Sequence, residues 1–148
     1  MSKRREPVQK RTVDVLEDVR TGHRQASFDG PQAARKYLER VFAGQHSLPN
    51  AVKFFAYDLL ADACAQCGDA ERRDEAIALA RENAAAAEAD TPREYKAYLP
   101  SIRMYEVGIA GAVDDGRFDD ALALCDEAVA LGLGRVYEQK ADTIRRMQ

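Results

Sequence analysis

Apolar residues recur along this chain at spacings of three and four, which places them on one face of an α-helix. The clearest example follows Pro49, where Val52, Phe55, Leu59 and Ala63 share a face. No stretch alternates β-branched and polar residues over the length of a strand. We therefore predict an all-α protein of about seven helices. Because short turns make neighbouring helices antiparallel, we expect them to form stacked helical hairpins.

Prolines and glycines mark the predicted helix boundaries, since proline is tolerated at the start of a helix and glycine commonly follows its end. This punctuation predicts hairpins at about 8–44, 49–89 and 91–132, and a terminal helix at 135–147. The segment from Thr91 to Glu94 has the pattern of a capping box. Pro100 should kink or break its helix near Leu99, with Ser101 able to cap the resumed helix.

The overall composition fits a helical protein without a membrane span. The chain has 148 residues, of which 46% are hydrophobic, and it has no tryptophan. It has no run of about 18 apolar residues, and its first residues lead into no apolar signal region. Three cysteines are an odd number without a secretory signal, so we expect reduced thiols and a cytoplasmic protein.

Charge is distributed unevenly along the chain. Residues 1–49 contain 10 Lys/Arg and 6 Asp/Glu, whereas residues 50–148 contain 12 and 19. We predict a flexible basic arm at residues 1–11 and one helical domain at residues 12–148. The arm is either a solvated terminus or a contact for nucleic acid, with Arg20 and Arg24 as further contacts. Its candidate nucleic-acid contacts are Lys3, Arg4, Arg5, Lys10 and Arg11.

A repeated pattern of small residues lies within the predicted hairpins. After the turn formed by Gly116 and Phe118, residues Ala121, Cys125 and Ala128 follow at spacings of four and three. Similar spacing occurs at positions 34, 38 and 41, and more weakly at 76, 80 and 83. Alanines at 34, 61, 76, 121 and 128 would occupy sites where hairpins approach closely.

Over residues 28–148 this pattern resembles the tetratricopeptide repeat family. The sequence departs from that family at Cys64 and Ala112, where the repeat usually has an aromatic residue. The resemblance implies a right-handed superhelix whose concave face binds peptides or partner proteins and rarely performs chemistry. A generic bundle of helical hairpins is the alternative.

The resemblance also implies which side chains face the groove. Together they give a mixed, net acidic surface with an apolar strip, and Asp58 and Asp62 stand where the family's carboxylate clamp has basic or amide donors. A basic or amphipathic segment is therefore the expected guest. The implied groove residues are Phe55, Asp58, Leu59, Asp62, Gln66, Arg103, Glu106, Val107, Ala110 and Asp114.

No motif in the sequence points to catalysis or to a cofactor. Cys64 and Cys67 form a C-x-x-C at a predicted helix C-terminus, where the dipole opposes a reactive thiolate, so core packing is the better interpretation. The acidic turn from Asp114 to Asp120 lacks the alternating oxygens of a calcium loop. His23 fits a surface or capping role. We expect a non-enzymatic adaptor or regulatory protein without metal or cofactor, in which pairing with a second copy stays open. The alternative is a nucleic-acid-associated regulator.

Overall fold

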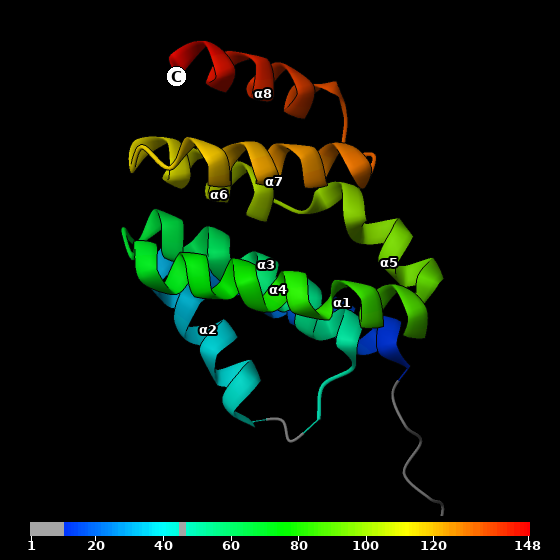
Figure 1. Cartoon of the computed structure of the whole chain (residues 1–148). Helices are drawn as coiled ribbons and strands as arrows, with labels where there is room; N and C mark the ends of the chain where they lie inside the picture. The colour runs from blue at the N-terminus through cyan, green and yellow to red at the C-terminus, as the bar shows by residue number, and fades with distance from the viewer. Residues whose placement is uncertain (1–10, 45–46) are drawn as a thin grey trace, which may run out of the picture.

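The structure, a computed structural model, describes residues 11–44 and 47–148. In this part of the chain it contains eight α-helices and one short 3₁₀-helix, and no strand (Figure 1). The predicted all-α class is confirmed. The helices are α1 (Thr12–Ser27), α2 (Pro31–Gly44), α3 (Asn50–Gln66), α4 (Ala70–Asp90), α5 (Pro92–Tyr98), η1 (Leu99–Ser101), α6 (Met104–Asp114), α7 (Phe118–Ala130) and α8 (Arg135–Met147).

Neighbouring helices pack in pairs, and the pairs lie against one another in layers (Figure 1). Helices α3 and α4 make the most extensive contact and occupy the middle of the molecule. Helices α1 and α2 pack against α3 on one side, and α6 contacts both α3 and α4 on the other. Helix α7 packs on α6, and α8 covers α7 at the C-terminal end. No helix among the described residues is both long and apolar enough to cross a membrane.

Three helices end in the same way. Gly68, Gly116 and Gly132 follow α3, α6 and α7 with φ angles of 75°, 74° and 75°. Positive φ is the left-handed region that glycine adopts at little cost. The next residue after each glycine donates its N–H to the carbonyl five positions back, which is the Schellman pattern. These bonds measure 3.0 Å to Cys64, 2.8 Å to Ala112 and 3.1 Å to Ala128.

The predicted break at Pro100 is confirmed, and it explains why eight α-helices occur where about seven were expected. Helix α5 ends at Tyr98, residues 99–101 form η1, and α6 begins at Met104. The capping role predicted for Ser101 is wrong, because its hydroxyl donates to the Tyr98 carbonyl at 2.6 Å. The capping box predicted at Thr91 is wrong too, since its hydroxyl donates back to Ala87 of the preceding helix at 3.2 Å.

The core depends on small residues where helices meet. The five alanines at positions 34, 61, 76, 121 and 128 are all buried, as predicted from their spacing. Gly108 extends this pattern on α6, because a Cβ there would meet the side chains of Ile77 and Leu124 at 3.0 Å. Close approach of backbones lets larger side chains such as Phe54 and Tyr105 fill the remaining space completely.

Candidate functional site

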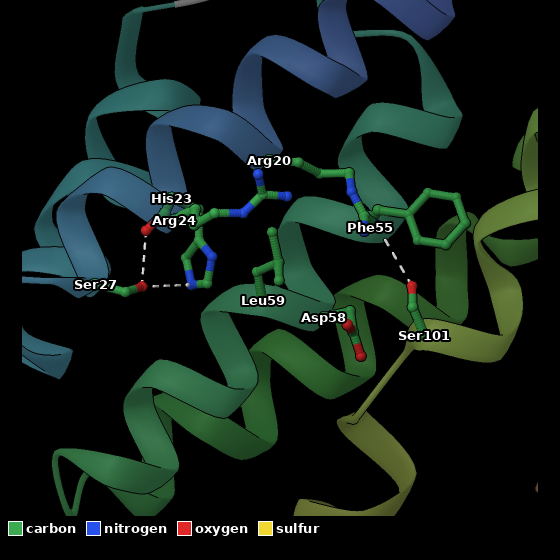
Figure 2. Close-up of a pocket in the computed structure, with 8 residues that line it drawn as sticks. All are labelled: Arg20, His23, Arg24, Ser27, Phe55, Asp58, Leu59 and Ser101. Atoms are coloured by element: carbon green, nitrogen blue, oxygen red, sulfur yellow. Dashed lines mark hydrogen bonds between the residues drawn. The ribbon is translucent and has the colours of Figure 1, made fainter.

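A hollow of about 350 Å³ lies between α1, α3 and η1 (Figure 2). We call it the α1–α3 hollow. One wall comes from the C-terminal half of α1, the floor from α3, and the far edge from the 3₁₀ turn before α6. Its lining residues are Arg20, His23, Arg24, Ser27, Phe55, Asp58, Leu59 and Ser101.

The α1 wall is basic because Arg20, His23 and Arg24 are spaced at three and four residues on one helical face. Arg20 places its guanidinium 4.6 Å from the centre of the Tyr98 ring and donates to Ser101 Oγ at 3.4 Å. Arg24 extends toward the middle of the hollow over Leu59 (Figure 2). Burial lowers the pKa of His23, with Arg20 adding to the effect and Asp62 opposing it. At neutral pH the two guanidinium groups therefore supply the positive charge of this wall.

The floor of the hollow is mainly apolar. Phe55 is 2% exposed, and its ring packs edge-on against Tyr98 with centroids 5.8 Å apart. Leu59 lies one helical turn further along α3 and is partly exposed to the hollow. An arginine wall above an apolar floor can hold an occupant that combines an anionic group with an apolar one.

Asp58 also lines the hollow, but its carboxylate is already engaged. The side chain is 3% exposed, and Oδ1 accepts hydrogen bonds from the backbone N–H groups of Arg103 at 2.8 Å and Met104 at 2.7 Å. Asp58 thus caps the N-terminus of α6 from a different helix, which is favourable because N–H groups and the positive dipole end point there. Burial raises the pKa of Asp58 to about 7, against the lowering effect of the two amides.

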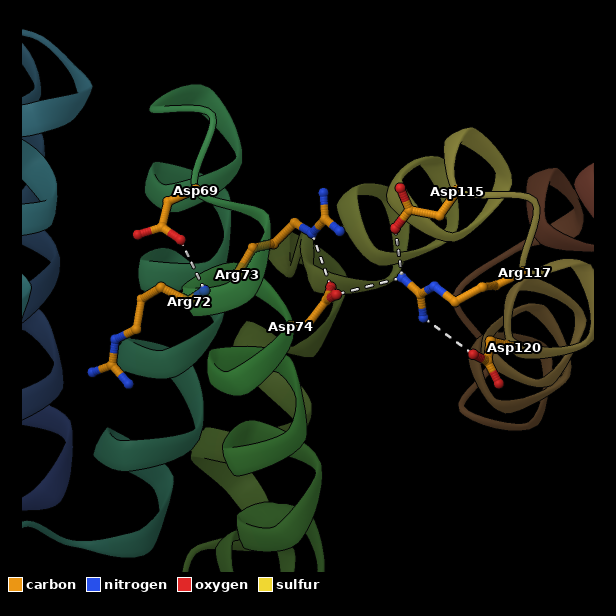
Figure 3. A network of polar contacts seen from close by, with 7 residues as sticks. All are labelled: Asp69, Arg72, Arg73, Asp74, Asp115, Arg117 and Asp120. Atoms are coloured by element: carbon orange, nitrogen blue, oxygen red, sulfur yellow. Dashed lines mark hydrogen bonds and ion pairs between the residues drawn. The ribbon is translucent and has the colours of Figure 1, made fainter.

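The opposite end of α6 has a matching cation. Arg73 of α4 is buried, donates to Asp74 at 3.0 Å, and lies so close to Gly111 that a Cβ there would overlap its guanidinium (Figure 3). Gly111 belongs to the last turn of α6, where a positive charge is favourable. Asp58 and Arg73 are the two buried charged side chains of the described residues, and they lie at the two ends of one helix.

The groove residues predicted from the sequence fall into three groups. Phe55, Asp58 and Leu59 meet in the α1–α3 hollow. Ion pairs and hydrogen bonds link others along α3 and α6: Gln66 donates to Asp62 at 3.3 Å, and Arg103 lies 3.9 Å from Asp62 and 3.1 Å from Glu106.

Ala110 and Asp114 line a separate hollow of about 430 Å³ between α6 and α8, while Val107 is partly buried against the core. Ala110 and Asp114 therefore lie apart from the α1–α3 hollow. The resemblance implies that Asp58 faces the groove, whereas its carboxylate is buried at the start of α6 and accepts two backbone hydrogen bonds there.

The predicted nucleic-acid contacts can be placed only in part. Lys3, Arg4, Arg5 and Lys10 lie outside the described residues. Arg11 is exposed at the start of α1 and pairs with Asp14 at 3.1 Å. Arg20 and Arg24 belong to the α1–α3 hollow.

The cysteines and the acidic turn serve packing and local ion pairs. Cys64 and Cys125 are buried free thiols, and burial raises the pKa of each. In the turn before α7, Arg117 pairs with Asp115 at 3.2 Å, with Asp120 at 3.1 Å and with Asp74 of α4 at 3.4 Å (Figure 3). Among residues 11–44 and 47–148 no cluster of three side chains could hold a metal ion.

The sequence analysis named Arg20 and Arg24 only as nucleic-acid contacts and did not predict that α1 and η1 join α3 around one hollow. Arg20, His23, Arg24 and Ser27 recur at three- and four-residue spacing on the polar side of α1, so a signal was present in the sequence. Ser101 gave no such signal, because its place depends on the break at Pro100.

The fold and hollow define an all-helical protein with a basic and apolar recess. Comparison with protein-family models, curated proteins and solved structures finds no match to the chain.

Proposed function

We propose that the protein is a non-enzymatic interaction module that binds a peptide segment of a partner protein, with α1, α3 and α6 forming the binding face of a short tetratricopeptide-like stack. The observation that carries this proposal is the α1–α3 hollow, which combines an apolar floor with two arginines that pair with no carboxylate of the described residues. Such concave sites are where ligands bind most often.

The succession of contacts supports the proposed stack. Each predicted hairpin pairs its own two helices, and α3 and α6 each contact both helices of the hairpin before them. The shared glycine ends of α3, α6 and α7 give three turns one backbone geometry, as expected of repeated units. The reduced thiols fit a cytoplasmic setting, which is part of this proposal.

Affinity capture from native lysate tests the function, with exposed positions on the binding face changed. Gln66 lies at the end of α3 and Glu106 on α6, and both are exposed. The double variant Gln66→Arg with Glu106→Arg should lose most of the captured partner, because two longer side chains would sterically obstruct a segment lying across these helices.

A matched control carries the same change of charge on the other helix of the hairpins. Gln32 on α2 and Glu82 on α4 are also exposed, so Gln32→Arg with Glu82→Arg should leave capture unchanged. Equal capture by the wild type and both double variants would contradict binding at this face. Capture of DNA or RNA instead of protein would favour the nucleic-acid alternative.

A further inference from the structure

The arginines of the α1–α3 hollow differ from most other arginines that bridge helices. Arg35 of α2 pairs with Asp69 at 2.7 Å, Arg72 with Glu39 at 2.9 Å and Arg81 with Glu127 at 2.6 Å. Arg20 contacts only a hydroxyl and a ring, and Arg24 makes no hydrogen bond or ion pair with the described residues. Among the described residues, neither guanidinium group of the hollow pairs with a carboxylate, although Asp58 lies in its lining.

Nearby carboxylates do not supply that missing partner. Asp58 directs Oδ1 to the two amides at the start of α6, and its burial disfavours the charged form. Asp62 lies further along α3, where Gln66 and Arg103 engage it. The charges that face the hollow are therefore dominated by Arg20 and Arg24.

Arg20 is also held in place before any ligand binds. Its guanidinium stacks over Tyr98 and reaches Ser101, so little side-chain freedom remains to be lost on binding. The planar donor fork of arginine suits a carboxylate, which accepts two parallel hydrogen bonds. Beneath the arginines, the partly exposed Leu59 offers apolar surface for a neighbouring side chain of the same ligand, and the buried Phe55 lies one helical turn before it on α3.

We propose that the α1–α3 hollow binds an acidic, amphipathic peptide segment, with an Asp or Glu carboxylate on Arg20 and Arg24 and a large apolar side chain over Leu59. This inference rests on the proposed function and specifies the chemistry of the guest. It reverses the basic guest expected from the sequence, because the acidic residues named there are engaged within the fold.

Selection from a random peptide library tests the proposal on the full chain. The wild type should enrich peptides with an acidic residue beside a large apolar one. Arg24→Ala should lose the acidic preference and weaken binding of the enriched peptides about ten-fold. Arg24 is exposed and pairs with none of the residues that the structure describes, so the variant should fold normally, which circular dichroism and thermal unfolding verify.

The control Arg146→Ala removes the same charge from an exposed position on α8 and should bind as the wild type does. If Arg24→Ala enriches the same acidic peptides as the wild type, the proposed binding of a carboxylate by Arg20 and Arg24 is overturned. Enrichment of peptides without acidic residues by the wild type would overturn it too. So would failure of the library to yield any binder, or competition by a mixed-sequence oligonucleotide that depends on Arg24. The proposed function is tested separately by affinity capture. If the wild type captures a partner protein that the Gln66→Arg and Glu106→Arg double variant does not, the proposed function still holds when the carboxylate proposal fails.

Discussion

Helices α4 and α6 begin in contrasting ways. Helix α4 is capped by its own preceding residue: Asp69 accepts a hydrogen bond from the Arg72 N–H at 3.0 Å, and its side chain reaches solvent (Figure 3). Helix α6 has no cap in its own segment and uses Asp58, which lies 45 residues before Arg103 and is buried. One helix start is fixed by local sequence, and the other by tertiary packing.

The difference shows where the molecule is most sensitive to change. A local cap can be lost while solvent satisfies the freed N–H groups. The Met104 amide is buried and the Arg103 amide is partly buried against α3, so removing Asp58 leaves the Met104 N–H without a partner where water replaces it poorly. Substitutions of Asp58, Asp69 and Gly111 test whether the tertiary contacts of α6 contribute more to stability than the local cap of α4.

The largest effect is expected from Asp58→Ala. Loss of the cap and two unsatisfied amides, one of them buried, should lower the free energy of unfolding by about 3 kcal/mol at neutral pH, measured by urea denaturation. Asp69→Ala removes the local cap and the ion pair with Arg35 but should cost clearly less, because its side chain is 33% exposed and water can reach the freed groups. Equal losses in the two variants would contradict the contrast between the local and the tertiary cap.

A smaller loss is expected at the other end of α6. In Gly111→Ala the new methyl group would overlap the Arg73 guanidinium, which must shift although it is buried. Since this group is the end of a flexible side chain, the loss relative to Gly44→Ala should be about 1–2 kcal/mol of unfolding free energy. Gly44→Ala on α2 provides the control, since a Cβ there meets nothing within 4 Å. If thermal unfolding finds the Gly111→Ala variant as stable as the Gly44→Ala variant, the close contact between Gly111 and Arg73 does not contribute to stability.

The smallest effect is a pH dependence that belongs to Asp58. Its pKa in the folded state is about 7, above the ordinary value of 3.8, so between these values the folded protein binds a proton that the unfolded chain does not. Stability should therefore rise on acidification, by about 1 kcal/mol from about pH 8 to about pH 6.

The variant Asp58→Asn isolates this effect, because it keeps an acceptor oxygen and does not titrate. Subtracting its unfolding free energies from those of the wild type removes contributions such as that of His23. A difference that stays constant between the two pH values would contradict the raised pKa. The control Asp29→Asn removes an exposed carboxylate from the turn after α1 and should retain the wild-type dependence.

Sequence reasoning was most successful where structure depends on neighbouring residues. Pro100 and the glycines at 68, 116 and 132 act through their own backbone, so helix ends could be predicted from them. The buried alanines followed from helical spacing. The cap predicted at Thr91 failed because the preceding helix competes for its hydroxyl. The role of Asp58 had no sequence signal, since it depends on the placement of α6 beside α3.

The two buried charges also determine which way α6 can run. Asp58 faces its N–H groups and Arg73 lies against its last turn. A reversed α6 would set carbonyl oxygens against the Asp58 carboxyl group and N–H groups against the Arg73 guanidinium, which is unfavourable at both ends. Apolar packing alone tolerates either direction of a helix. Asp58 and Arg73 together therefore favour one direction of α6 over the other, and this direction determines on which side of the molecule the chain enters α7.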